Sequence, residues 1–332
     1  MTFIPGLGHT SVLRVICASV SMVDGSVMEE LLAMREQVSA FNIAVGVRSA
    51  LLHSSGWFFQ WYEGSVEGVN KALRVAQADP RHGRMQTLHR SVGPATLDEP
   101  LQIATTHSAD KPTDLARRLF RLKQGQALEG TAQPHELWMQ LVAPPGLMGS
   151  ETAESALVQR HVVAVTSGNS GAVDLVRSIG QRAGAHVTYQ RFASGAPKAA
   201  DVGAVYVDLP GSFHVMRLQA LSRRSLSHPM VRLMLRDVQC VLLLLGEHVD
   251  SSRALAGDVG TLLQRLALRP SLRLAGACPG NAGAARECLH ASSSDISDLD
   301  PAMLWQAGPD ALFRSLLGTR HRERAEIPAL IG

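Results

Sequence analysis

The chain has 332 residues, of which 45% are hydrophobic and 18% charged, and its formal net charge at pH 7 is +3. This composition is typical of a folded globular protein and excludes a disordered or fibrous chain. The length predicts two domains. Because the basic residues are scattered among acidic ones, the sequence has no basic stripe, and we expect no nucleic-acid partner.

The spacing of cysteine, histidine and apolar residues bears on the cellular location of the protein and on whether it has a metal site. The four cysteines show no C-x-x-C spacing, the histidines show no H-x-x-x-H or H-E-x-x-H spacing, and no secretory start is present. The longest apolar run, at 240–245, is far shorter than the roughly 20 residues that span a bilayer. We therefore expect a cytoplasmic protein without a metal site, without a membrane partner and without enzymatic activity.

The first hundred residues have the pattern of an α+β domain. Helical spacing of apolar residues predicts helices at 27–38 and 65–77. Asp24 or Ser26 would cap the first helix, and Ser65 the second. Strand-like runs occupy 12–18, 43–52, 57–62 and 85–91, with a further one at 101–104. The resulting order, βαββαβ with a last strand to give βαββαββ, is ferredoxin-like. We place this domain at 11–105.

The rest of the chain has a different pattern. Residues 106–142 are expected to form cap helices, and the A-P-P-G stretch with the polar residues after it predicts a linker at 143–158. From 159 to 332, strand-like runs alternate with amphipathic segments, which favours an α/β domain with a parallel sheet. The apolar run at 240–245 suits a central strand of that sheet.

Four short motifs follow one another in the first domain. They are V-L-R-V-I-C-A-S at 12–19, N-I-A-V-G-V-R-S-A-L-L at 42–52, G-W-F-F-Q-W-Y-E-G at 56–64 and D-P-R-H at 79–82. In this order they resemble the BLUF family, which are flavin-based blue-light sensors. The third motif is similar to the family's G-x-F-F-Q-x-L-E-G at nearly every position. In the second, Asn42 and Gly46 match N-x-x-x-G-I-T-G-x-L-L, whereas the threonine and second glycine are missing.

The resemblance implies a cofactor and roles for individual residues. An FAD ring would lie between the two helices, Gln60 would bridge a hydroxyl to the flavin, and Asn42 would hold the polar edge of the ring. The amide of glutamine suits such a bridge because it both donates and accepts hydrogen bonds. Arg81 and His82 would lie near the phosphate tail. The implied cofactor-binding set is Cys17, Ser19, Asn42, Gln60, Arg81 and His82.

Cys17 departs from the family at its central position. The family has its photoactive tyrosine there, and a thiol is a shorter and weaker hydrogen-bond donor than a phenol. We therefore expect the ordinary photocycle to be absent. Two interpretations stay open at this point: the pocket keeps FAD beside a silent Cys17, or Gln60 and Asn42 persist as structural amides in an empty pocket.

The second domain resembles the bacterial small GTPase family with an eroded phosphate loop. Compared with G-x-x-x-x-G-K-[ST], Gly171 keeps the second glycine, whereas Ala172 replaces the lysine and Val173 the magnesium-binding hydroxyl. D-L-P-G after a strand resembles the family's D-x-P-G, and no N-K-x-D motif is found. The degenerate nucleotide site would comprise Gly168, Gly171, Asp208 and Gly211.

The sequence thus predicts a BLUF-family sensory and signalling protein that binds FAD and has lost its photocycle. The alternative is a cofactor-free regulatory scaffold built from a degenerate BLUF domain and a pseudo-GTPase domain. In both cases we expect a protein partner at the C-terminal domain or the cap helices, and a homo-oligomer is a further option.

Overall fold

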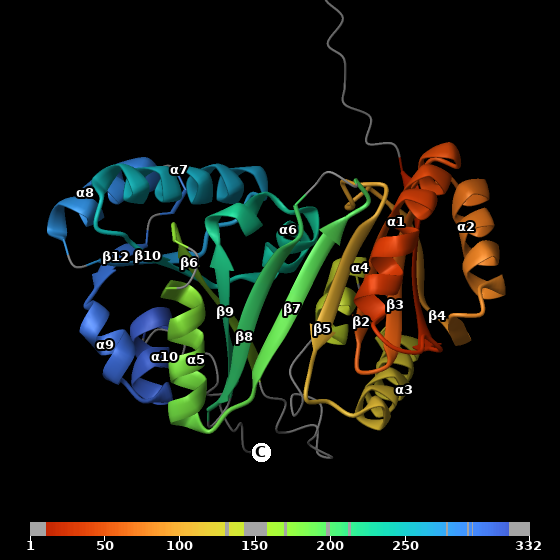
Figure 1. The fold of residues 1–332 in the computed structure, drawn as a ribbon, viewed down its shortest axis with the longest axis horizontal. Coiled ribbons are helices and arrows are strands. Elements are labelled where there is room, and N and C mark those ends of the chain that lie inside the picture. The colour runs from red at the N-terminus through yellow and green to blue at the C-terminus, as the bar shows by residue number, and fades with distance from the viewer. Residues whose placement is uncertain are drawn as a thin grey trace, which may run out of the picture. The chain divides into compact units, whose positions relative to one another are not determined.

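The computed structural model describes residues 11–129, 133–142, 158–168, 171–196, 200–211, 214–276, 278–290, 292–293 and 295–318. The chain divides into two compact units, and the division does not follow the sequence in a simple way. The first unit contains residues up to 143 together with 190–202 and 228–233. The second contains 144–189, 203–227 and the remainder from 234. Each unit is described separately below (Figure 1).

The first unit is built on a sheet whose strands lie in the spatial order β7-β5-β2-β3-β1-β4. Strand β1 is antiparallel to β3 and β4, whereas β2 is antiparallel to β3 and parallel to β5. The strands are β1 (Val12–Ser21), β2 (Val47–Ser54), β3 (Trp57–Gly64), β4 (His82–Gly93), β5 (Gln102–His107) and β7 (Val187–Ser194), of which residues 190–194 belong to this unit.

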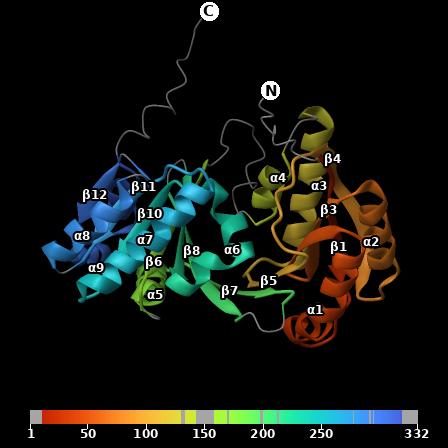
Figure 2. The same cartoon turned by 90° about the horizontal axis from the view of Figure 1, so that it is seen from above.

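Helices cover both faces of this sheet, as Figure 2 shows. One face carries α1 (Val27–Ala44) and α2 (Val66–Ala78), and the other carries α3 (Pro112–Glu129) and α4 (Pro134–Leu141). Side chains alternate between the faces along each strand. Trp61 of β3 therefore packs on Trp138 of α4, with ring centroids 5.9 Å apart, whereas Gln60 lies on the face of α1 and α2.

The sequence explains where the helices on the first face begin and end. Ser26 and Ser65 are the N-caps of α1 and α2, and their side chains accept hydrogen bonds from the backbone N–H groups of Glu29 and Gly68. Gly46, at φ +65°, ends α1 in the left-handed region that glycine favours. Ile43 and Ala44 consequently belong to the helix, Val45 is its C-cap, and β2 starts at Val47 rather than at 43.

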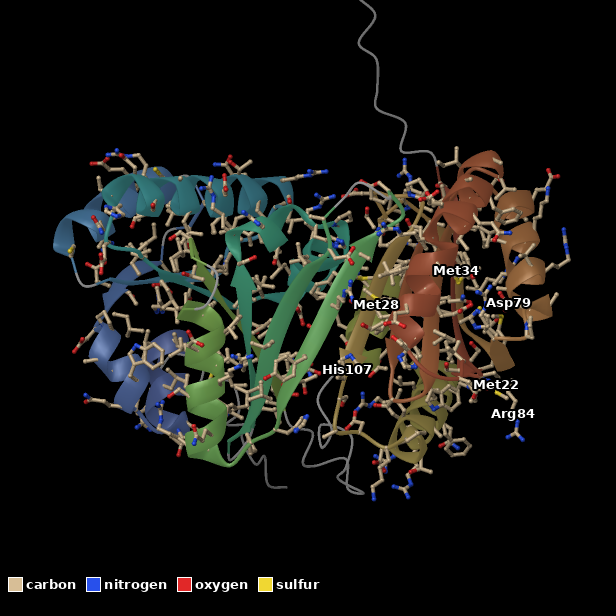
Figure 3. All side chains as sticks on the ribbon, in the orientation of Figure 1. Met22, Met28, Met34, Asp79, Arg84 and His107 are labelled. Atoms are coloured by element: carbon tan, nitrogen blue, oxygen red, sulfur yellow. The ribbon has the colours of Figure 1, made fainter. Side chains whose placement is uncertain are left out.

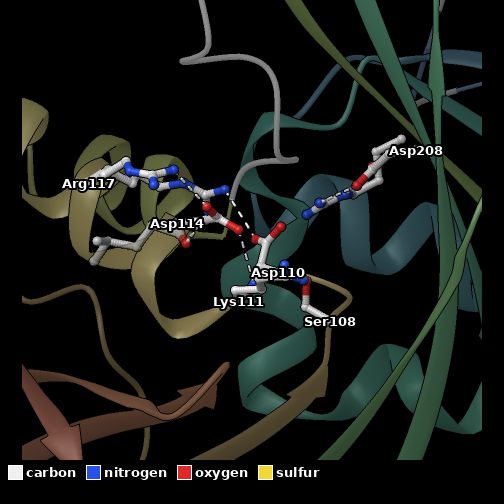
Figure 4. Close-up of polar contacts among 9 residues, drawn as sticks. Ser108, Asp110, Lys111, Asp114, Arg117 and Asp208 are labelled. Carbon is white, nitrogen blue, oxygen red and sulfur yellow. Dashed lines mark hydrogen bonds and ion pairs between the residues drawn. The ribbon is translucent and has the colours of Figure 1, made fainter.

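Helix α3 begins with a cluster of polar contacts (Figure 4). Asp114 accepts a hydrogen bond from the backbone N–H of Lys111 at 3.2 Å and pairs with Arg117 one turn later. Asp110, just before the helix, pairs at 3.3 Å with the buried Arg118, which also donates to the carbonyl of Leu141. These contacts tie the start of α3 to the end of α4.

The second unit has a mostly parallel sheet in the spatial order β12-β11-β10-β6-β9-β8. Strands β10 and β9 both run parallel to β6, while β8 is antiparallel to β9. The strands are β6 (Val158–Thr166), β8 (Val202–Pro210), β9 (His214–Ser222), β10 (Cys240–Leu244), β11 (Ser271–Ala275) and β12 (Ile296–Leu299).

Helices lie on both faces of the second sheet as well (Figure 1). One face carries α7 (Val249–Arg265) and α8 (Pro279–Leu289), and the other carries α5 (Gly171–Ala183), α9 (Pro301–Gln306) and α10 (Pro309–Leu317). Because β10 is covered on both faces, its residues from 240 to 243 are all buried. Residues 229–233 of the short helix α6 (Pro229–Met234) belong to the first unit.

The ferredoxin-like order of the first domain is confirmed by β1-α1-β2-β3-α2-β4-β5. The cap helices expected in 106–142 correspond to α3 and α4. The division of the chain at 158 differs from the observed one, because residues 190–194 form a strand beside β5. Of the expected linker, residues 143–157 lie outside the described residues. Within the described part of the chain, none of the helices combines the length and the apolar character required to cross a bilayer.

Candidate functional site

Cys17 and Gln60 face each other in the centre of the first sheet. The register of β1 and β3 pairs these two residues, and the register of β1 and β4 pairs Cys17 with Thr87. The Cys17 thiol is 2% exposed and lies 3.8 Å from Thr87 Oγ1. Gln60 is also buried, and its Oε1 has no hydrogen-bond partner among the described residues. A buried amide oxygen without a partner is costly unless a ligand or water supplies one.

His82 connects Gln60 to Ser19. Its Nε2 lies 3.3 Å from Gln60 Nε2, and its Nδ1 lies 2.8 Å from Ser19 Oγ. The imidazole packs on the ring of Phe58, with centroids 4.9 Å apart. Four of the six cofactor-binding candidates, Cys17, Ser19, Gln60 and His82, are thus brought together on the face that α1 and α2 cover.

Asn42 lies near the end of α1, on the same face of the sheet. Its Nδ2 donates to Ser49 Oγ at 2.9 Å and to the carbonyl of Pro100 at 2.8 Å. Both amide protons therefore bond to the protein. Asn42 joins α1 to β2 and to the segment that leads into β5.

Arg81 is part of an ion-pair group at the end of α2. It contacts Asp79 through two nitrogens, with its closest approach at 2.6 Å, and its Nη1 lies 2.8 Å from Glu30 Oε1 of α1. The hydrogen bond from Arg81 lowers the pKa of Asp79 and in turn raises that of Arg81. The guanidinium that the sequence assigned to a phosphate tail is thus already paired, and it links α1 to the turn before β4.

Burial decides the charge state of the central groups. It raises the pKa of the Cys17 thiol, and it lowers the pKa of His82, against an opposing effect of Asp79. Cys17 is therefore a neutral thiol and His82 a neutral imidazole at pH 7. Both contribute dipoles rather than charges to the site.

Tyr62 is a site residue that the sequence analysis missed. It is 7% exposed, lies two residues after Gln60 on β3, and packs in the same buried cluster as Cys17. Burial is the main reason that its pKa is raised, and proximity to Cys17 and Asp79 adds to the effect. The signal was present in the third motif, where Tyr62 stands at the position of the family's leucine.

The loop after β6 in the second unit has the features of a turn rather than of a phosphate cradle. Thr166, in place of the family's first glycine, accepts a hydrogen bond from the backbone N–H of Gly168 at 3.3 Å. Ala172 is fully buried with Leu175 and Val176 in the core beneath α5, so its side chain points away from any ligand. Residues 169 and 170 lie outside the described residues.

The structure does not bring Asp208 and Gly211 to this loop. Asp208 lies inside β8 and forms a bidentate ion pair with Arg217 of β9, at 2.8 and 2.9 Å (Figure 4). Gly211 closes the β8–β9 hairpin with a hydrogen bond to the carbonyl of His214. His214 pairs with Val158, at the start of β6, whereas Thr166 ends that strand. At about 3.3 Å per residue, the hairpin and the loop lie at opposite ends of the sheet.

Comparison with protein families identifies residues 12–95 as matching the family described as "BLUF: Sensors of blue-light using FAD". These residues comprise β1 to β4 with α1 and α2, and they include all six cofactor-binding candidates. This part of the chain is a BLUF domain, and its role is sensory and signalling. No curated protein matches the chain.

Solved structures that resemble the chain include proteins whose titles name a BLUF domain or BLUF protein. "BlrP1 BLUF" is 23% identical, with a TM-score of 0.25. The match covers 29% of this chain and 66% of the BlrP1 BLUF chain. "BlrB" in its dark state is 19% identical, with a TM-score of 0.27, and the match covers 39% of this chain and 92% of the BlrB chain. Klebsiella pneumoniae BlrP1, in a manganese and cyclic-diGMP complex, is 14% identical, with a TM-score of 0.28, and the match covers 91% of this chain and 78% of the BlrP1 chain. Similarities at this level transfer no activity to the present chain.

Proposed function

We propose that the BLUF domain of residues 12–95 binds FAD between α1 and α2, and that the protein is a sensor whose ordinary light response is lost at Cys17. The observation that carries this proposal is the buried Gln60, whose Oε1 lacks a partner on the face of the sheet that these helices cover. A flavin edge, with its N–H and carbonyl groups, is a suitable partner for both ends of that amide.

The surrounding residues fit such a cofactor. Gln60 would hydrogen-bond to the ring edge, and neutral His82 would contact the amide of Gln60 and hold it in place. Asn42, near the end of α1, would offer its amide to the ring as well. Bound flavin supplies the light-absorbing and redox-active group. The residues from this chain contribute hydrogen bonds without any net charge, which suits a neutral ring in a buried site.

The loss of the light response follows from the chemistry of Cys17. The resemblance assigns electron and proton donation to a tyrosine at this position, and the Cys17 thiol is buried, neutral and directed to Thr87 instead. Such a thiol is a poor donor of either particle, because oxidation proceeds through the thiolate.

The second unit is proposed to act as a protein-binding platform that has lost its nucleotide. Its β6 lies between β9 and β10, where the strand order reverses, which is the usual ligand position in α/β sheets. The buried Ala172 and the turn formed by Thr166 and Gly168 leave no cation for a phosphate group. The free state of all four cysteines supports a reducing, cytoplasmic location.

An alternative function is a scaffold without any cofactor. It is favoured by Asn42, whose two amide protons bond to the protein, and by Arg81, which is paired with Asp79 and Glu30. In that case the residues of the first unit would be structural, and both units would act through their surfaces.

An absorption spectrum of the purified full-length protein, before and after incubation with FAD, tests the proposal. We expect a flavin absorption spectrum with vibronic structure. Gln60→Leu should weaken FAD binding at least tenfold, whereas Gln159→Leu, at a glutamine of the second unit, should not. A colourless protein that takes up no FAD would establish the scaffold instead.

A further inference from the structure

Strand β4 forms the free edge of the first sheet. It pairs with β1 on one side, and no strand among the described residues pairs with it on the other. At the opposite side of this sheet, β5 is covered by β7. An edge strand leaves alternate backbone N–H and C=O groups without a partner in the sheet, and a strand of another chain can hydrogen-bond to them. The first sheet can therefore be extended at β4.

The regular part of β4 is its second half. Residues 89–93 pair one-to-one with residues 12–16 of β1, and the register then shifts twice toward the start of β4. At the second shift, Arg84 adopts a positive φ of 51°. Such bulges bend a strand and hinder pairing along an edge. A partner strand would therefore pair with residues 89–93, a length close to the usual strand of about five or six residues.

Exposed arginines lie along this edge, on the side of α2. Arg90 is opposite Val15 in the register, and its Nη2 lies 3.3 Å from Asn70 Oδ1 of α2. Arg74 follows Asn70 by one helical turn, so it lies on the same side of α2. Arg84 extends from the bulge, and Figure 3 shows its side chain directed away from the ribbon. All three arginines are exposed.

These arginines have no acidic partner within the described part of the chain. No ion pair joins Arg74, Arg84 or Arg90 to a carboxylate there, whereas Arg81, just before β4, pairs with an aspartate at 2.6 Å. The acidic residue of α2, Glu67, precedes Arg74 by two turns, or roughly 10 Å. The edge of β4 and the neighbouring side of α2 therefore carry positive charge that no paired carboxylate neutralises.

We propose that the edge of β4 binds an extended acidic segment of a partner protein, which pairs with residues 89–93 as an added strand. Backbone hydrogen bonds supply affinity in this mode of recognition, and side chains on alternate positions supply specificity. Acidic side chains on the α2 side meet Arg74 and Arg90. Val92, which is 66% exposed and lies on the same face as Arg90, adds an apolar contact. All these groups belong to the first unit, so the surface depends neither on FAD nor on the second unit.

A second copy of this chain is a poorer occupant of the same edge. If two β4 strands paired antiparallel around Thr87, Arg84 of one copy would lie opposite Arg90 of the other by residue count. Like charges on directly opposed residues destabilise a strand pair. The arginines thus oppose self-pairing and favour an acidic strand.

Fluorescence anisotropy of the full-length protein with a labelled peptide of about ten residues, alternating glutamate and valine, tests the surface. We expect saturable binding that Arg90→Glu and Arg74→Glu each weaken at least tenfold. Arg253→Glu is the matched control, because it makes the same change of charge at an α7 side chain that is 52% exposed, and it should bind as the wild type does. No saturable binding to the wild type, or an equal loss in Arg253→Glu, would overturn the proposal.

Two further measurements separate strand addition from attraction between charges alone. Hydrogen exchange followed by mass spectrometry should slow at residues 89–93 when the peptide is bound. It should not change at β12, the edge strand of the second sheet. A peptide with proline in place of valine keeps the charges but cannot form the ladder, so it should bind at least tenfold more weakly.

Three outcomes would each contradict an acidic strand as the occupant. Equal binding of the proline peptide would show that no ladder forms. Tighter binding of a single-stranded oligonucleotide of similar length would identify a nucleic acid as the partner. Exchange at residues 89–93 that slows with protein concentration in the absence of peptide would identify a second copy of the chain.

Discussion

Tyr62 and Cys17 pack in one buried cluster, on the face of the first sheet that α1 and α2 cover. The family motif has leucine at the position of Tyr62, whereas it has tyrosine at the position of Cys17. Compared with the motif, the larger side chain of the pair stands on β3 and the smaller one on β1. The buried phenol therefore belongs to β3 instead of β1.

The first prediction concerns packing. Cys17→Tyr alone adds a second phenol to a filled cluster and should lower the free energy of unfolding by about 1–3 kcal/mol. Combining it with Tyr62→Leu should recover most of this loss, because the double variant has the arrangement of the family. Urea denaturation of the wild type, both single variants and the double variant measures the coupling. Strictly additive losses would show that the two side chains do not compete for space.

The second prediction concerns light. Flavin-loaded wild-type protein should show no reversible red shift of its absorption under blue light, because Cys17 replaces the donor next to Gln60. The double variant, Cys17→Tyr with Tyr62→Leu, should show such a shift. A red shift that is already present in the wild type and is abolished in Tyr62→Phe would instead identify Tyr62, on β3, as the electron donor to the flavin.

The sequence predicted the first unit well because its signals are local. The caps Ser26 and Ser65, and the alternation along β1 and β3, determine each element and its face. The pairing of Cys17 with Gln60 followed from a resemblance that covers these strands. Contacts between distant segments, such as residues 190–194 beside β5, leave no periodic signal and were not predicted.

The interpretation of the second unit shows the limit of short motifs. D-L-P-G was assigned to a nucleotide site because it follows a strand, yet the antiparallel direction of β8 places it at the opposite end of the sheet from Gly168. Strand direction depends on the partner strand, here β9, and four residues do not encode it. The ion pair of Asp208 with Arg217 could not be predicted from the sequence either, because it depends on the register of β8 and β9.

The third prediction concerns thiol reactivity. Burial raises the pKa of Cys17, and it raises that of Cys240 to about 12, so both remain protonated at pH 8. Cys278 is exposed and should be the first to react with a thiol reagent. Mass spectrometry of the native protein after brief alkylation should locate the label at Cys278. Labelling of Cys17 as fast as Cys278 would contradict a buried, inert thiol.

The fourth prediction assigns Asp208 a structural role. Arg217 is 2% exposed, and removing its partner leaves a buried guanidinium without its bidentate acceptor. Asp208→Ala should therefore lower the free energy of unfolding by about 3 kcal/mol. Asp250, whose side chain is 93% exposed, provides the control, since Asp250→Ala should change stability by less than about 0.5 kcal/mol. Equal effects of the two substitutions would contradict the structural role.

The last prediction is that the protein neither hydrolyses GTP nor binds it at micromolar concentration. The loop after β6 offers the buried Ala172 in place of a lysine, and Val173 has no hydroxyl to hold magnesium. Backbone dipoles at a helix start contribute on the order of 1 kcal/mol per interaction, whereas micromolar affinity requires about 8 kcal/mol. Asp208, paired with Arg217 in the hairpin, adds nothing at this end of the sheet.

Calorimetric titration with GTP and magnesium decides the matter. The full-length chain is the right sample, because residues 190–202 and 228–233 belong to the first unit and a fragment that starts near residue 155 would separate them from it. We expect no measurable heat of binding, and the same result for Asp208→Ala. A dissociation constant below about 10 μM, equivalent to roughly 7 kcal/mol, would overturn the prediction. It would require that the loop bind phosphate through its backbone alone.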